Sequence, residues 1–121
     1  MKEEQIGLEA EMCQILIKLR MNPTYSSNYM CLKDAILIAI DHPNTWQDTY
    51  LETIGKQRNV TRERIRQILY KTVWDNWNKE SKNVLAVHFG RDVQTHFQYA
   101  KPNHIEFIEM MANLIRENNS L

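Results

Sequence analysis

Five side chains between residues 62 and 70 are of the types that read the edges of base pairs. An arginine can bond to guanine, and a glutamine to adenine, through two hydrogen bonds each in the major groove of DNA. In a helix, steps of three and four residues place such side chains on one face. We therefore interpret as base-contacting residues Arg62, Glu63, Arg66, Gln67 and Tyr70.

Basic residues surround this set and predict contacts with phosphates. The segment 56–71 contains six basic residues and one acidic residue, whereas the whole chain has a net charge of zero. A basic patch on an otherwise acidic protein is attracted to a polyanion such as DNA, although a solvated helix face can have the same composition. The candidate phosphate-contacting residues are Lys56, Arg58, Thr61, Arg64 and Lys71.

The helix that must carry these residues is predicted to run from residue 61 to about residue 76. Thr61 is a favoured N-cap, and Val60 and Ile65 have the spacing of a hydrophobic staple. A preceding helix at about 49–57 ends in a polar break, so the two helices are expected to form a helix-turn-helix with 61–76 as the recognition helix. The buried stripe of that helix is expected to consist of Ile65, Ile68, Leu69 and Val73.

The remaining sequence favours an all-α fold. Hydrophobic residues make up 43% of the chain, and three glycines and three prolines are too few for the many tight turns of an all-β protein. Apolar periodicity predicts further helices at about 8–19, 28–40, 84–89 and 105–116. For residues 91–100 the sequence is ambiguous and fits either a loop or a helical turn. We expect a single domain, residues 1–121, built as a compact bundle of about six helices.

Catalytic and metal-binding chemistry has little support. The histidines lie too far apart for a helical metal-binding pair, and no Gly-rich phosphate loop or nucleophile motif is present. We therefore expect no catalytic residue, cofactor or metal. Trp74 and Trp77 are expected in the core rather than as a stacking platform. The histidines concerned are His42, His88, His96 and His104.

The cellular environment is predicted from what the sequence lacks. Cys13 and Cys31 do not have metal-ligand spacing and are expected as buried reduced thiols. No apolar run reaches the length of a membrane-spanning helix, and the first residues do not resemble a signal peptide. We expect a cytoplasmic, nucleoid-associated protein with no membrane contact.

Residues 51–68, LETIGKQRNVTRERIRQI, resemble the fourth conserved region of primary bacterial sigma factors. In that family this helix-turn-helix reads the upstream promoter hexamer, and its base-reading positions match Arg62, Glu63, Arg66 and Gln67. In sigma factors the motif lies near the C-terminus, whereas here a long segment follows Trp77. The resemblance leaves a second interpretation open, a sigma-like interaction module that binds RNA polymerase rather than DNA.

From about residue 8 to residue 116 the chain resembles the C-terminal effector domain of the sporulation stage-zero master response regulator family. The resemblance implies an all-α, six-helix domain that binds double-stranded promoter DNA, with a possible homodimer on tandem sites. It also implies contact with the sigma subunit of RNA polymerase through Val84, Phe89 and Val93, although apolar residues such as Phe89 and Val93 are more often part of a core. The matching landmarks are Pro23, residues 29–36, Trp77, Phe89-Gly90, residues 100–102 and residues 106–108.

The chain also departs from that family. The family usually has a Glu-Arg pair where this chain has Arg66-Gln67, an arginine where it has Tyr70, and a small polar residue where it has Val84. These differences predict another target sequence and leave activation and repression both open. The family's receiver domain is missing from the sequence, so we expect either a stand-alone DNA-binding protein or part of a longer response regulator.

Overall fold

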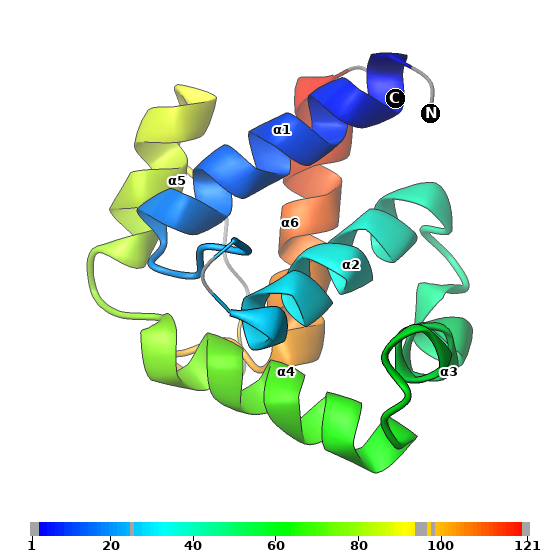
Figure 1. The fold of residues 1–121 in the computed structure, drawn as a ribbon. Coiled ribbons are helices and arrows are strands. Elements are labelled where there is room, and N and C mark those ends of the chain that lie inside the picture. The colour runs from blue at the N-terminus through cyan, green and yellow to red at the C-terminus, as the bar shows by residue number, and fades with distance from the viewer. Residues whose placement is uncertain (1–2, 25, 94–96, 98, 120–121) are drawn as a thin grey trace.

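The computed structural model describes residues 3–24, 26–93, 97 and 99–119, with no side chains described before Gly7, and it confirms the all-α class (Figure 1). Within these residues the chain forms helices and no strand. The predicted ambiguity over 91–100 falls partly on residues 94–96 and 98, which lie outside the described residues, as does His96. The helices are α1 (Glu3–Lys18), α2 (Ser27–Asp41), α3 (Trp46–Arg58), α4 (Arg62–Asn76), α5 (Ser81–Phe89) and α6 (His104–Asn118).

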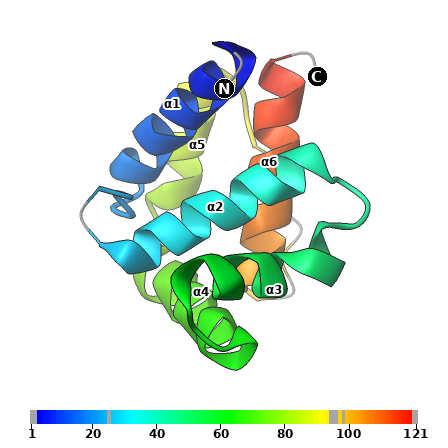
Figure 2. The same ribbon diagram turned by 45° about the vertical axis from the view of Figure 1, so that its right-hand side comes forward.

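The helix α2 lies at the centre of the bundle. It contacts α1, α3, α4 and α6, while α5 packs against α1 on the side away from α3 (Figures 1 and 2). The helices α3 and α4 lie together at one end of the molecule, and α4 also contacts α6. This arrangement supports α4 along one side and leaves its other side at the outer surface.

The helix boundaries follow from local signals in the sequence. Gly90 ends α5 with a φ of 69°, a left-handed conformation that glycine adopts without strain. The start of α6 has a capping box, in which the Asn103 side chain accepts from the Glu106 N–H and the Glu106 carboxylate accepts from the Asn103 N–H. The predicted ends of these helices are therefore confirmed.

The start of α3 differs from the prediction. This helix begins at Trp46, three residues before the predicted start at residue 49. The Trp46 N–H donates to the carbonyl of His42 over 2.9 Å, and the buried indole donates to Glu109 of α6 over 2.7 Å. A tertiary contact with α6 thus fixes the first turn of α3, and the local sequence around Pro43 does not reveal it.

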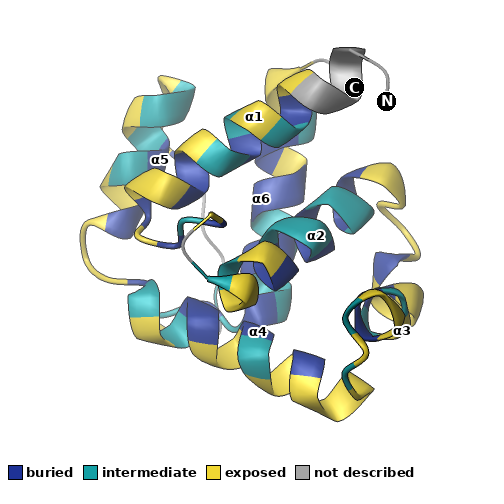
Figure 3. Ribbon diagram, in the orientation of Figure 1, coloured by how far each residue is buried: buried dark blue, intermediate teal, exposed yellow. Residues whose placement is uncertain are grey.

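The core runs through all six helices, and the apolar residues predicted for α4 belong to it. Ile65, Leu69 and Val73 are fully buried, and Ile68 is half-buried at the edge of the stripe (Figure 3). The buried set also includes Met12, Leu16, Leu32, Ile36, Ile54, Leu85, Phe107, Ile108, Met111 and Ile115. Within the described part of the chain, no helix combines the length and the hydropathy that crossing a membrane requires.

Candidate nucleic-acid interface

The connection between α3 and α4 is a tight turn over residues 59–61. Asn59 has a φ of 55°, a left-handed conformation that asparagine tolerates better than most residues. The Val60 N–H donates to the carbonyl of Gly55 over 2.9 Å. A Cβ atom on Gly55 would lie 2.7 Å from the Val60 carbonyl oxygen, so only glycine permits this close approach. The polar break predicted after residue 57 is present, one residue later than predicted.

The first turn of α4 is capped as predicted. Thr61 precedes the helix in an extended conformation, and its hydroxyl accepts a hydrogen bond from the Arg64 N–H over 3.1 Å. Glu63, in the same turn, lies near the positive end of the helix dipole. The predicted helix start at Thr61 is therefore confirmed, and it fixes the direction in which each later side chain of α4 points.

All five predicted base-contacting residues lie on the exposed face of α4. Glu63 and Arg66 form an ion pair on this surface. Tyr70 stacks on Trp74, with ring centroids 5.9 Å apart and planes inclined by 9°. The side chains of Arg62 and Gln67 have neither a hydrogen bond nor an ion pair with any residue that the structure describes. The face is thus free of contacts from the rest of the bundle along most of its length.

The predicted phosphate-contacting residues divide into two groups. Lys56 and Lys71 are exposed, and within the described part of the chain their ion pairs are surface pairs in their own helices, with Glu52 and Asp75. Such exposed pairs contribute little to stability and leave the ammonium groups available to a ligand. Arg64 is exposed and has no ion pair among the described residues, whereas the Thr61 hydroxyl already serves as the cap of α4.

Arg58 is turned away from this surface. Its guanidinium donates to Asp34 of α2 over 2.7 Å, and both side chains are mostly buried. The hydrogen bond to Asp34 raises the pKa of Arg58 further above its usual value. This ion pair fastens the end of α3 to α2, so the structure gives Arg58 a partner within the bundle rather than a free position beside the other cations.

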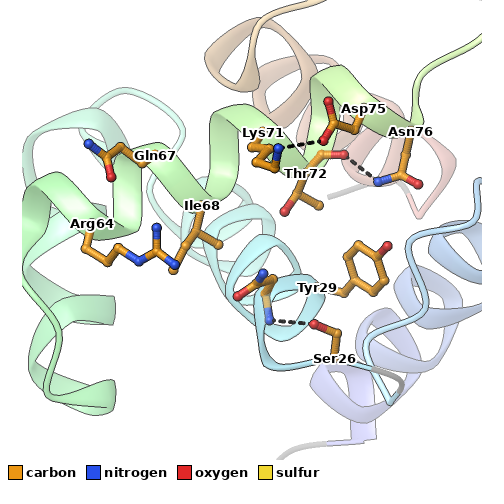
Figure 4. A pocket seen from close by; sticks show the side chains of 10 residues that line it. Ser26, Tyr29, Arg64, Gln67, Ile68, Lys71, Thr72, Asp75 and Asn76 are labelled. Atoms are coloured by element: carbon orange, nitrogen blue, oxygen red, sulfur yellow. Dashed lines mark hydrogen bonds and ion pairs between the residues drawn. The ribbon is translucent and has the colours of Figure 1, made fainter.

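One edge of α4 borders a groove that the sequence did not indicate. The groove encloses about 470 Å³ between α4 and the first turn of α2 (Figure 4). On the α4 side, Arg64, Lys71 and Asp75 line it. On the α2 side, Ser26 and Tyr29 line it together with Asn28. From the sequence, Ser26 could be identified only as a possible N-cap of α2. An N-cap indicates where a helix begins, but it does not indicate that this end of α2 lies beside α4.

The C-terminal half of the face is aromatic. The prediction of a buried core position is confirmed for Trp77, but it is wrong for Trp74, which is only half-buried. The Lys101 ammonium lies 5.2 Å from the Trp74 ring centroid and donates to the Trp74 carbonyl over 3.1 Å. The segment before α6 therefore covers one side of Trp74, and Tyr70 covers another.

A buried polar pair lies beneath α4. The Tyr50 hydroxyl and Nε2 of His104 are 3.0 Å apart, and the Tyr70 ring contacts His104 edge-on. Burial, followed by the nearby charge of Arg66, lowers the pKa of His104 from 6.5 to about 4. Burial also raises the pKa of the Tyr50 hydroxyl. The pair is thus uncharged near neutral pH and connects α3, α4 and α6 at the base of the exposed face.

The predicted polymerase-contacting residues lie away from α4. Val84 is half-buried in α5, where it lines a small cleft with Lys18 and Arg20 at the end of α1. Phe89 is also half-buried, and Val93 is buried in the core. For Val93 the structure therefore supports the core interpretation, while Val84 remains partly accessible.

The remaining predictions concern thiols and metals. Cys31 is buried and Cys13 half-buried, both as free thiols, and burial raises the pKa of each. Among the described residues no cluster of histidine, cysteine and acidic side chains is placed to hold a metal ion.

Comparison of this chain with protein-family models, with curated proteins and with solved structures found no match.

Proposed function

We propose that this protein is a sequence-specific DNA-binding transcription regulator that inserts α4 into the major groove. The observation that carries this proposal is the exposure of Arg62, Arg66 and Gln67 on a helix whose opposite face is buried through Ile65, Leu69 and Val73. An α-helix fits the major groove, and these side chain types match the donor and acceptor patterns of guanine and adenine. The core then holds the helix rigidly while its outer face meets the bases.

The roles of the individual residues follow from their positions. Arg66 and Gln67 lie near the middle of the face and are the proposed base readers, with Arg62 and Glu63 beside them at the helix start. Glutamate can accept a hydrogen bond from the amino group of cytosine. In the free protein, the ion pair with Glu63 holds Arg66 over this surface, and a guanine would exchange that partner for its own acceptors.

Phosphate contacts would set the register of α4 on the duplex. Arg64, Lys71 and Lys56 are the exposed cations suited to this role, because contacts of this kind position a protein without reading sequence. We assign Arg58 a positioning role instead, since its ion pair with Asp34 holds α3, and hence the turn into α4, against α2.

Selection of bound duplexes from a random library, followed by titration at two salt concentrations, tests the proposal. Wild-type protein should enrich a defined motif and lose affinity steeply as salt rises. Arg66→Ala should relax the preference at one base pair at a cost of about 1–3 kcal/mol, whereas Lys71→Ala should weaken all sequences alike. Lys82→Ala, an exposed change on α5, is the matched control. A selection without enrichment, or an unchanged profile for Arg66→Ala, would contradict base reading by α4.

A second candidate function is contact with the sigma subunit of RNA polymerase, on promoters or without DNA. The observation in its favour is an apolar surface on α5, where Val87 is 73% exposed next to the half-buried Val84. Val87→Asp should abolish capture of the sigma subunit and leave the DNA titration unchanged.

The resemblance to the sporulation regulator family adds homodimer formation on tandem promoter sites to this proposal. Capture of polymerase without any salt-sensitive DNA binding would favour the interaction module.

A further inference from the structure

The groove between α2 and α4 has the composition of a surface that meets phosphate. Arg64 and Lys71 project from α4 on one side, and the first turn of α2 lies on the other side (Figure 4). Asp75 is the one acidic residue in the described lining, and Lys71 lies 3.4 Å from its carboxylate. The charges that line the groove are therefore positive on balance.

The α2 wall of the groove adds neutral hydrogen-bond donors. The side chains of Asn28 and Tyr29 line it, and the first turn of α2 contains no acidic residue. The Ser26 hydroxyl accepts the Asn28 N–H over 3.1 Å. Hydroxyl and amide groups of this kind, opposite an arginine and a lysine, are the usual partners of phosphate oxygens in protein–DNA complexes.

The two edges of α4 differ in what covers them. On the edge that faces α6, the Tyr70 ring contacts His104 with centroids 6.5 Å apart, so protein closes that side. On the other edge, the half-buried Ile68 forms the floor of the open groove between the charged residues. A ligand that runs along α4 therefore finds open, positively charged space on the side of α2.

We infer that this groove binds a stretch of the phosphodiester backbone of double-stranded DNA, so that the start of α2 forms part of the interface. The inference rests on the proposed function, because a helix in the major groove has a DNA backbone on either side of it. Contacts made by Asn28 and Tyr29 would be independent of sequence and would add to those of Arg64 and Lys71. The predicted surface of α3 and α4 then extends onto an element outside that pair.

A single near-isosteric substitution tests this inference with a matched control. Asn28→Asp places a negative charge in the groove, while an acid in the first turn of a helix is favourable to the fold. Asn83→Asp makes the same change in the first turn of α5, outside the groove. The measurement is the dissociation constant for a random-sequence duplex over a series of salt concentrations, because phosphate contacts do not require a known target.

We expect Asn28→Asp to weaken binding by about tenfold or more, since like charges placed together at an interface are strongly unfavourable. The slope of the logarithm of the binding constant against the logarithm of the salt concentration should become shallower, by about the amount that one released counterion contributes. Asn83→Asp should bind as the wild type does, and neither variant should lower the melting temperature. Asn28→Lys should bind the duplex more tightly than the wild type does, and its affinity should fall more steeply as salt rises.

The outcomes separate this inference from the proposed function. If Asn28→Asp binds with wild-type affinity and salt dependence while Arg66→Ala loses its base preference, DNA does not enter the groove and the proposed function stands. If the wild-type protein shows no salt-sensitive binding to any duplex, both the proposed function and the groove inference are wrong.

Discussion

At the residue scale, the exposed face of α4 combines opposite charges at its centre. Glu63 and Arg66 are ion-paired there, and both side chains remain about half exposed. An exposed pair of this kind contributes little to stability, so its main effect is on the position of the Arg66 guanidinium. It limits the directions in which the guanidinium can point before a base pair arrives, which lowers the entropy cost of a directed hydrogen bond.

Glu63→Gln tests this role of the ion pair. We expect the variant to bind a random duplex more tightly, because one negative charge leaves a surface that faces phosphates. Its selected motif should become less specific at the base pair read by Arg66, since the guanidinium is no longer held. Any change at the base pair that Glu63 itself contacts would be a separate effect, at another position of the motif. The measurement is a selection profile compared with that of the wild type. A profile that becomes more specific would contradict the proposed restraint.

The buried His104 predicts a dependence of stability on pH. Its pKa is 6.5 in the unfolded chain and about 4 in the folded protein. Between these values the unfolded state binds more protons, so the free energy of unfolding falls as the pH drops from 6.5 towards 4, by up to about 3 kcal/mol. Urea denaturation over this pH range measures the effect, and His104→Gln should flatten the profile. His42→Gln, at an exposed position, should leave the profile as steep as in the wild type.

At the scale of elements, the position of α4 depends on the turn that precedes it. The close approach of Gly55 to Val60 brings α3 and α4 together over residues 59–61, and the Arg58–Asp34 ion pair fastens α3 to α2. The outer face of α4 is therefore oriented by contacts that lie behind it. A change in the turn would move the whole face relative to the bundle, and all of its side chains together.

Gly55→Ala should be strongly unfavourable at this turn. The added Cβ would lie 2.7 Å from the backbone carbonyl oxygen of Val60, which cannot move without moving α4. We expect a loss of about 1–3 kcal/mol in the free energy of unfolding, together with weaker binding to the selected duplex. Asn59→Gly is the control, because glycine readily adopts the left-handed conformation of that residue. Equal stability of Gly55→Ala and wild type would show that the turn can relax.

The elements also show which features the sequence could predict. The start of α4 at Thr61 and its buried stripe follow from local capping and periodicity, and they were predicted correctly except that Ile68 is only half-buried. The early start of α3, the half-exposed Trp74 and the partner of Arg58 were missed. Each of these residues contacts a partner far away in the sequence: Glu109 for Trp46, Lys101 for Trp74 and Asp34 for Arg58. Periodicity contains no information on such pairs.

At the scale of the whole molecule, the two ends of the bundle are held by different interactions. Far from α4, the Glu11 carboxylate accepts hydrogen bonds from the side chains of Asn118 and Asn119, and His88 of α5 approaches it. This cluster connects α1, α5 and α6. The proposed DNA surface lies at the other end, on α4 and the start of α2 (Figure 1). Stability and binding can therefore be changed separately.

Glu11→Ala should demonstrate that separation. Loss of a mostly buried acceptor shared by three donors is expected to lower the free energy of unfolding by about 1–3 kcal/mol. Affinity for the selected duplex should stay unchanged at a temperature where the variant is folded. Glu117→Ala removes an exposed pair with Arg91 and should cost less than about 1 kcal/mol. A weakened DNA titration for folded Glu11→Ala would indicate that the two ends are coupled.

The division of α4 into a fully buried stripe and an outer face has a practical consequence. Arg62, Glu63, Arg66 and Gln67 are all exposed, and none of them belongs to the buried stripe, whereas Tyr70 also contacts Trp74 and His104. A combinatorial library randomised at Arg62, Glu63, Arg66 and Gln67 should thus consist mainly of folded members. Such a library would allow new binding preferences to be evolved on this scaffold without first restoring its stability.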